Sequence, residues 1–210
     1  RGENLSPWVD EVAELSSLYT RIGLCEHYEN DILIFPVGSR TLREMDEWTD
    51  ALVQFCTEKQ LCAKVTRCTL LQYTANAKYA YDTNRAYLED SIKVFPRRAC
   101  FTISEIEFVK ECRELAAGGE EHMRRYLSLL GPILEGKDGQ EIVDTLSAYL
   151  LDENSSVTQT AEHLFVHKNT VKYRLQKADN LLGFRVGDIP QSKNLLYTLA
   201  LRRILQRQPD

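Results

Sequence analysis

The sequence predicts a mostly helical α+β protein, with a mixed α/β region at residues 1–130 followed by an all-helical region at 140–210. Apolar residues recur at helical spacing through most of the chain. A short apolar run at 31–37 suits a buried strand. Three glycines and a proline fall between Gly131 and Gly139, which is typical of a boundary. We therefore expect residues 131–139 to form a linker between two domains.

The net charge changes sign at this boundary. Residues from 140 onward carry nine Lys or Arg and eight Asp or Glu, a balance of +1, whereas the preceding residues carry −6. The 43% of hydrophobic and 27% of charged residues are ordinary for a soluble globular protein. No apolar run approaches the roughly 20 residues that span a membrane. We expect a cytoplasmic protein without membrane contact and, since the chain does not begin with Met, a C-terminal portion of a longer protein or a trimmed chain.

Helical or alternating patterns, interrupted by glycine or proline, predict the elements of the first region. Ser6-Pro7 is typical of a helix start, and Thr41 with Glu44 has the pattern of a capping box. Gly118-Gly119 separates the last two helices. The expected helices lie at 6–22, 41–59, 74–95, 103–116 and 120–130, and the expected strands at 31–37 and 61–71.

The six cysteines show no metal-ligand spacing, and no His lies near Cys56, Cys62 or Cys68. We expect reduced cysteines that serve as small buried hydrophobic residues. Redox sensing is the alternative, although nothing nearby in the sequence would lower a thiol pKa.

Residues 157–181 predict a helix-turn-helix. Ser156 and Gln159 fit a capping box that opens the first helix. A break near Phe165-Val166 leads into a second helix with one apolar stripe. The stripe consists of Val171, Leu175, Ala178 and Leu182. Supporting helices are expected at 140–151 and 192–207, which gives a compact four-helix unit.

Between His167 and Lys177 the second helix has four Lys or Arg and no carboxylate. Asn169, Tyr173 and Gln176 point away from the apolar stripe, because successive helical residues are about 100° apart. Asn pairs with adenine edges and Lys binds guanine or phosphate, so double-stranded DNA is the expected partner. The alternatives are a solvated cationic face or a helix that binds an acidic protein.

The stretch 142–203 resembles the C-terminal DNA-binding domain of the PucR/CdaR group of bacterial transcription regulators. Its run HKNTVKYRL matches the signature His-x-Asn-Thr-Val-x-Tyr-Arg-Leu at every fixed position. The resemblance implies a Fis-like helix-turn-helix in a homodimeric regulator, not an enzyme, that controls a catabolic operon in response to a small-molecule effector. The candidate DNA-binding residues are Thr158, His167, Lys168, Asn169, Thr170, Lys172, Tyr173, Arg174 and Lys177.

The turn departs from the wider helix-turn-helix pattern at one position. Many such turns carry Gly where this chain has Phe165. Glycine adopts the left-handed conformation at little cost, so Phe165 must either tolerate backbone strain or form a different turn.

Residues 8–101 resemble the degenerate GGDEF-like domain that precedes the DNA-binding domain in relatives of CdaR. The resemblance places His27–Asp31 at the hairpin that carries the catalytic motif in working cyclases. Glu29 and Asp31 are carboxylates, but the glycines that allow close nucleotide approach are missing. We expect a fold without catalysis; the alternative is an enzyme that binds or converts nucleotides.

No catalytic, metal or cofactor site is expected. His163 and His167 have the spacing of a metal pair on one helical face, but the break at Phe165-Val166 separates them.

Overall fold

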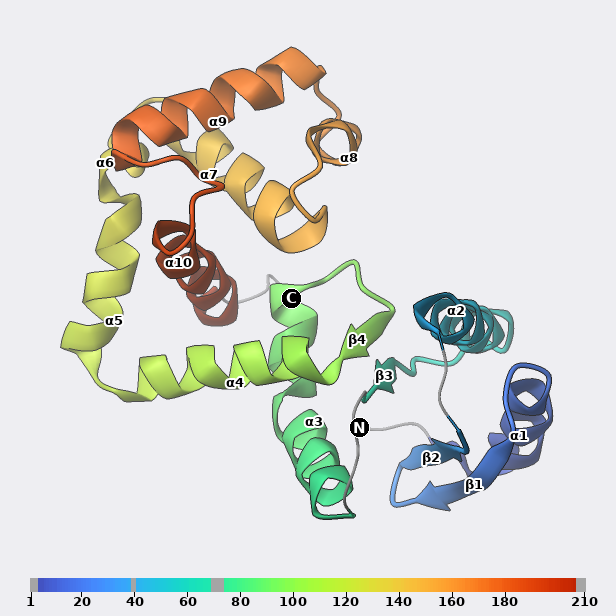
Figure 1. Ribbon diagram of the computed structural model, residues 1–210. Coiled ribbons are helices and arrows are strands. Elements are labelled where there is room, and N and C mark those ends of the chain that lie inside the picture. Colours follow the sequence, from blue (N-terminus) through green and yellow to red (C-terminus); the bar gives the residue numbers. More distant parts are fainter. Residues whose placement is uncertain (1–3, 39–40, 69–73, 207–210) are drawn as a thin grey trace. The chain divides into compact units, whose positions relative to one another are not determined.

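The computed structural model describes residues 4–38, 41–68 and 74–206 (Figure 1). It is mostly helical with two small two-stranded sheets, so the expected α+β class is confirmed. The chain divides into two compact units, which are described in turn. The first comprises Arg1–Leu70 and Ala99–Ile103, and the second comprises Leu71–Arg98 and Ser104–Asp210.

The helices of the first unit begin where the sequence predicts. A 3-10 turn, η1 (Ser6–Trp8), leads into α1 (Val9–Ser17). Helix α2 (Leu42–Glu58) opens with the expected capping box. The Thr41 hydroxyl accepts a hydrogen bond from the Glu44 backbone N–H, and the Glu44 carboxylate accepts one from the Thr41 backbone N–H. Helix α1 ends earlier than expected, because the chain turns after Ser17 and continues as a strand.

Strands β1 (Ile22–Tyr28) and β2 (Asp31–Pro36) form an antiparallel hairpin. Only β2 is predicted by the sequence, and it is less buried than the fully buried strand expected at 31–37. Phe35 is 37% exposed, whereas Ile32 and Ile34 pack against the core. The hairpin buries one face only, which is why no continuous apolar run marks β1.

The second sheet pairs β3 (Val65–Arg67) with β4 (Cys100–Thr102) in parallel. The strand expected at 61–71 is therefore reduced to three residues, and positions 69–71 lie outside the described residues. The core of the first unit centres on Val12, Trp48 and Leu52.

The second unit begins with the long helix α3 (Thr74–Val94), which ends before Pro96 as predicted. Helices α4 (Ile103–Ala117) and α5 (Glu120–Leu127) follow. They are separated at Gly118-Gly119, and Gly119 has the positive φ of 101° that glycine accommodates. Helix α5 ends sooner than expected, and a 3-10 turn, η2 (Ser128–Leu130), replaces its last turn.

The segment 131–139 differs from the expected linker. It contains the short helix α6 (Gly131–Leu134), whose Ile133 is fully buried. A Cβ added to Gly139 would lie 2.3 Å from the Ile133 carbonyl oxygen, so backbone packs directly on backbone here. The segment is a tight corner, and the two compact units do not divide at residues 130 and 140.

The C-terminal helices match the predicted four-helix arrangement. Helix α7 (Gly139–Ser147) continues into a π-helix, η3 (Ala148–Asp152). Helices α8 (Val157–His163), α9 (Lys168–Leu182) and α10 (Gln191–Leu205) follow. Figure 1 shows α7 and α9 crossing, with α8 near one end of α9. Position 207, expected in the last helix, lies outside the described residues.

Candidate nucleic-acid interface

The first helix of the motif is capped largely as the sequence predicts. The Ser156 hydroxyl accepts a hydrogen bond from the Gln159 backbone N–H at 3.3 Å, which is one half of the expected capping box. Ala161 is 3% exposed and lies on the inward side of α8. Thr158, a candidate DNA-binding residue, is exposed in the first turn of this helix.

The turn between the two helices is built around Phe165, which adopts the left-handed φ of 53°. The Val166 N–H donates a hydrogen bond to the Ala161 carbonyl oxygen at 3.0 Å, and the Phe165 N–H donates one to the Glu162 carbonyl oxygen at 3.3 Å. These two bonds form a Schellman motif with Phe165 at the position that glycine usually occupies. The structure thus selects the strained alternative, and the Phe165 side chain is 96% exposed.

His167 has a structural role that the sequence does not reveal. It is the N-cap of α9, and its Nδ1 accepts a hydrogen bond from the Asn169 backbone N–H at 3.2 Å. The ring nitrogen therefore satisfies one of the helix's otherwise unpaired N–H groups, as Ser or Asp does elsewhere. The ring is exposed beside Lys168, at the positive end of the helix.

The predicted apolar stripe of α9 packs inward. Val171 and Ala178 are fully buried, and Leu175 and Leu182 are half-buried. Helix α9 packs against α6, α7 and α8 on this side. The opposite face is consequently turned to solvent.

This outward face carries the amide, aromatic and cationic side chains that the sequence predicts. Asn169, Lys172 and Gln176 are exposed, and Tyr173 is 59% exposed. Among the described residues, Lys168 and Lys172 form no ion pair. Thr170 is half-buried in the first turn of the helix. The face combines groups that can bond base edges with cations that can bind phosphates.

Arg174 and Lys177 are placed differently from the other candidates. Arg174 forms an ion pair with Glu141 and donates to the Thr145 hydroxyl at 3.4 Å. Lys177 Nζ donates to both carboxylate oxygens of Asp138 at 2.7 Å. The hydrogen bond from Lys177 holds the pKa of Asp138 below its usual range, and the same bond raises the pKa of Lys177.

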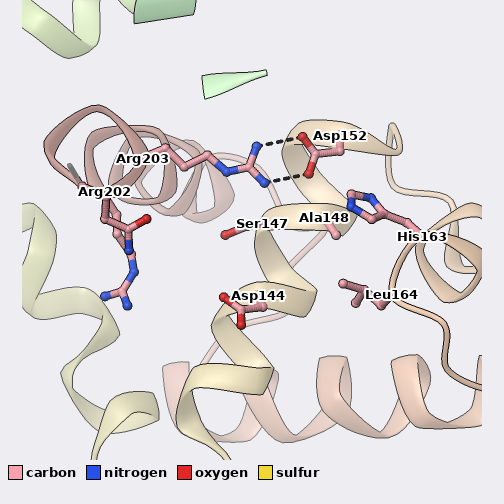
Figure 2. A pocket seen from close by; sticks show the side chains of 9 residues that line it. Asp144, Ser147, Ala148, Asp152, His163, Leu164, Arg202 and Arg203 are labelled. Carbon is pink, nitrogen blue, oxygen red and sulfur yellow. Dashed lines mark hydrogen bonds and ion pairs between the residues drawn. The ribbon is translucent and has the colours of Figure 1, made fainter. Parts of the chain in front are cut away.

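A pocket of about 190 Å³ lies among η3, α8 and α10, and no sequence pattern predicts it. Figure 2 shows Arg203 reaching across to Asp152, with two hydrogen bonds of 2.6 and 2.7 Å, while Arg202 points away from that pair. Arg202 donates to the Gln140 side chain at 2.8 Å. The terminal arginines of α10 thus connect this helix to α7 and to η3.

The two histidines with metal-pair spacing have separate partners. His163 Nδ1 lies 2.8 Å from a Glu153 carboxylate oxygen, whereas His167 caps α9 beyond the break. Among the described residues, no three His, Cys, Asp or Glu are grouped as a metal site would require.

In the first unit, the β1–β2 turn consists of Glu29 and Asn30, at the place where the sequence suggests a hairpin. Glu29 has a φ of 55°, a conformation that glycine adopts more cheaply. Glu29 lies in this turn, and Asp31 directly follows it as the first residue of β2.

The described cysteines include two whose thiols are disfavoured as thiolates. Burial raises the pKa of Cys112 to about 12, and it also raises the pKa of Cys25. Cys112 is buried and fits the expected role of a small buried hydrophobic group. That expectation is wrong for the exposed Cys62 and holds only in part for Cys25, Cys56, Cys68 and Cys100, which are half-buried. None of the described helices combines the length and apolar character needed to cross a membrane.

Comparison with known proteins gives two findings. Residues 142–202 match the PucR C-terminal helix-turn-helix domain, a span that includes all of α8 and α9. Over 87 residues the chain is 34% identical to the purine catabolism regulatory protein of Bacillus subtilis (strain 168). This alignment covers 41% of the chain and only 16% of that relative. No solved structure is significantly similar to the chain. The first match is to a helix-turn-helix domain, and the second is to a protein named as a regulator.

Proposed function

We propose that the chain belongs to a sequence-specific DNA-binding transcription regulator, with α8 and α9 as its helix-turn-helix. The observation that carries the proposal is the outward face of α9. That face presents Asn169, Lys172 and Tyr173 to solvent, within the region similar to a PucR-type domain. A cationic, amide-bearing face on a protein of net charge −5 fits a phosphate backbone with base edges between the phosphates.

The candidate residues have separate tasks in this proposal. Asn169 bonds a base edge in the major groove, whereas Lys168 and Lys172 neutralise phosphates. Thr158 and Thr170, each in the first turn of its helix, lie where backbone N–H groups also attract phosphate oxygens.

The working unit in this proposal is a homodimer. A single helix-turn-helix makes too few contacts for tight specific binding, so two copies occupy half-sites about one helical turn apart. Because the relative is named a purine catabolism regulatory protein, we take the target to be a catabolic operon. We further propose that a small-molecule effector provides the signal. Such a regulator acts in the bacterial cytoplasm, where the DNA is.

For residues 8–101 we propose a degenerate GGDEF-like fold, within a region 1–130 that serves in dimer contact or signal reception. The β1–β2 hairpin with its turn at Glu29-Asn30 supports this assignment. A turn without glycine offers no close backbone approach for a nucleotide. Incubation with GTP and Mg²⁺ tests the assignment, because turnover would contradict the loss of catalysis.

The proposed function is tested by selecting DNA duplexes from a random-sequence library and measuring their binding by fluorescence anisotropy. The selected duplex and a scrambled version are compared from about 50 to 200 mM salt. We expect a large preference for the selected duplex that persists at the higher salt, and paired half-sites within it. Equal binding to both duplexes that disappears with salt would contradict the proposal.

A further inference from the structure

The four cations of α9 fall into two groups by their partners: among the described residues Lys168 and Lys172 form no ion pair, whereas Arg174 and Lys177 are each paired with a carboxylate. Lys172 follows fully buried Val171 by one residue and is exposed. Arg174 follows Val171 by three residues, which places it only about 60° from the inward direction. Its side chain contacts Glu141 and Thr145 of α7.

The surroundings of Arg174 form a built binding site for a guanidinium group. Its side chain is 16% exposed, although arginine is among the residues that most often remain in solvent. Glu141 forms an ion pair with it and the Thr145 hydroxyl accepts a second bond at 3.4 Å. Thr145 is fully buried and is itself oriented by a 2.7 Å bond from its hydroxyl to the Glu141 carbonyl.

A second tie lies one helical turn further along α9. Lys177 Nζ contacts both oxygens of Asp138, the residue directly before α7. Side chains of Lys177 and Asp138 are 35% and 34% exposed, whereas in the first pair Arg174 is 16% and Glu141 61% exposed. Two cations three residues apart thus bind two carboxylates three residues apart, which fixes the rotation of α9 about its own axis.

We infer that Arg174 is a positioning residue that orients the recognition helix through Glu141 and Thr145. The Lys177–Asp138 pair is the second tie, and phosphate binding is left to Lys168 and Lys172. This inference rests on the proposed DNA-binding function. A phosphate that took Arg174 away from Glu141 would leave an uncompensated carboxylate beside the DNA, which opposes such a contact.

The experiment uses the full chain with Arg174→Gln, Glu141→Gln and the double variant, measured against the selected and scrambled duplexes over a salt series. We expect each single variant to reduce the preference for the selected duplex by about tenfold, because a charged hydrogen bond that sets the helix angle is lost. The double variant should be no worse than either single one. The slope of log affinity against log salt should stay unchanged.

The opposite role gives opposite results. If Arg174 binds a phosphate, Arg174→Gln flattens the salt slope by about 0.9, as expected for one lost phosphate contact. Glu141→Gln then strengthens DNA binding, because it removes a competing carboxylate. Either result would overturn the inference. Lys172→Gln is the matched control, since it removes a cation from the outward face of the same helix and should flatten the slope.

A charge exchange separates positioning from general support of the fold. The double variant Glu141→Arg with Arg174→Glu restores the tie while placing a carboxylate on α9. Recovery of the duplex preference lost in the single variants supports the inference, whereas no recovery together with a native unfolding temperature would overturn it.

Failure of the proposed function is distinguishable from failure of this inference. If the unaltered chain shows no preference for the selected duplex, the proposed function fails. The interaction between Arg174 and Glu141 is then tested by thermal unfolding of the Gln variants. Non-additive losses at positions 141 and 174 support the tie, and additive losses overturn it.

Discussion

The outward face of α9 and its α7-facing side carry the same kinds of cation in different surroundings. Lys172 is exposed and, among the described residues, forms no ion pair, whereas Arg174 is largely buried against Glu141 and Thr145. A sequence count assigns all four cations of the helix to DNA. The neighbouring helix divides them into two that are available for phosphate and two that are tied. The number of positive charges on a recognition helix is therefore an upper limit on its phosphate contacts.

The largest expected effect concerns a pair buried more deeply than Arg174 and Glu141. Asp152 is 2% exposed and binds Arg203 through two hydrogen bonds. Asp152→Ala leaves the guanidinium without its counter-charge, so the free energy of unfolding should fall by about 3–5 kcal/mol. Urea denaturation followed by circular dichroism measures this change.

The surface pair Arg43–Glu47 is the control for that prediction. Its contact is similarly short, at 2.8 Å, but its side chains are 88% and 54% exposed. Glu47→Ala should hardly change the urea midpoint, because solvent screens an exposed pair. If Asp152→Ala and Glu47→Ala reduced the free energy of unfolding equally, burial would not determine how much these ion pairs stabilise the fold.

The next effect is on base recognition by the outward face. Asn169→Ala removes an exposed amide without disturbing the buried stripe. Sequence preference at one base pair should weaken by about 1–3 kcal/mol, the usual value of a bidentate base contact. Binding to duplexes with single base-pair changes measures this effect. Unchanged preference at every position would remove Asn169 from direct base readout.

Lys172 and Lys177 should respond differently to the same substitution. Lys172→Ala should weaken binding to all duplexes and flatten the salt slope by about 0.9. Lys177→Ala should leave the slope unchanged, because Asp138 already neutralises this side chain. Lys78→Ala on the exposed surface of α3 is the control for charge removal outside the motif. Equal changes of the salt slope in Lys172→Ala and Lys177→Ala would contradict the division of the α9 cations into those that bind phosphate and those that are paired with carboxylates.

A smaller effect depends on pH. The hydrogen bond from Lys177 lowers the pKa of Asp138 in the folded protein. The resulting stabilisation is present above the ordinary Asp pKa of about 3.9 and is lost as the pH falls through the lowered value. Urea midpoints between about pH 6 and 2.5 should decline less steeply in Asp138→Asn than in the unaltered chain. Parallel curves of urea midpoint against pH would show that the Lys177–Asp138 pair does not stabilise the folded protein.

The smallest effect is expected at the turn. Phe165→Gly removes left-handed strain but adds freedom to the unfolded chain, so unfolding should change by less than about 1 kcal/mol. Gly183→Ala is the matched opposite, because Gly183 has a φ of 76° and nothing within 4 Å of an added Cβ. That variant should lose about 1 kcal/mol from backbone strain alone. A large loss in Phe165→Gly would show that the exposed phenyl group stabilises the fold.

The helix pair and its outward face were predictable because both depend on local patterns. The stripe from Val171 to Leu182 follows from helical spacing, and the break at Phe165-Val166 from its interruption. The capping box at Thr41 likewise needs only residues three apart in the chain.

What the sequence does not reveal depends on contacts between distant residues. The carboxylates that bind Arg174 and Lys177 lie 33 and 39 residues away. The angle of Arg174 relative to Val171, about 60°, is shared by exposed Lys168, so no local signal in α9 distinguishes the two cations. Strands β1 and β4 are short or exposed on one face, so pattern alone does not distinguish them from loops.

The corner between α6 and α7 has a consequence for how this protein can vary through evolution. A methyl group at Gly139 would lie 2.3 Å from one backbone atom and 2.8 Å from another, and no rotation of a side chain relieves a clash with backbone. Any homologue that keeps this corner must keep glycine at that position. Asp138 is the neighbour of that glycine, so the acceptor for Lys177 is attached to one of the least changeable points of the chain.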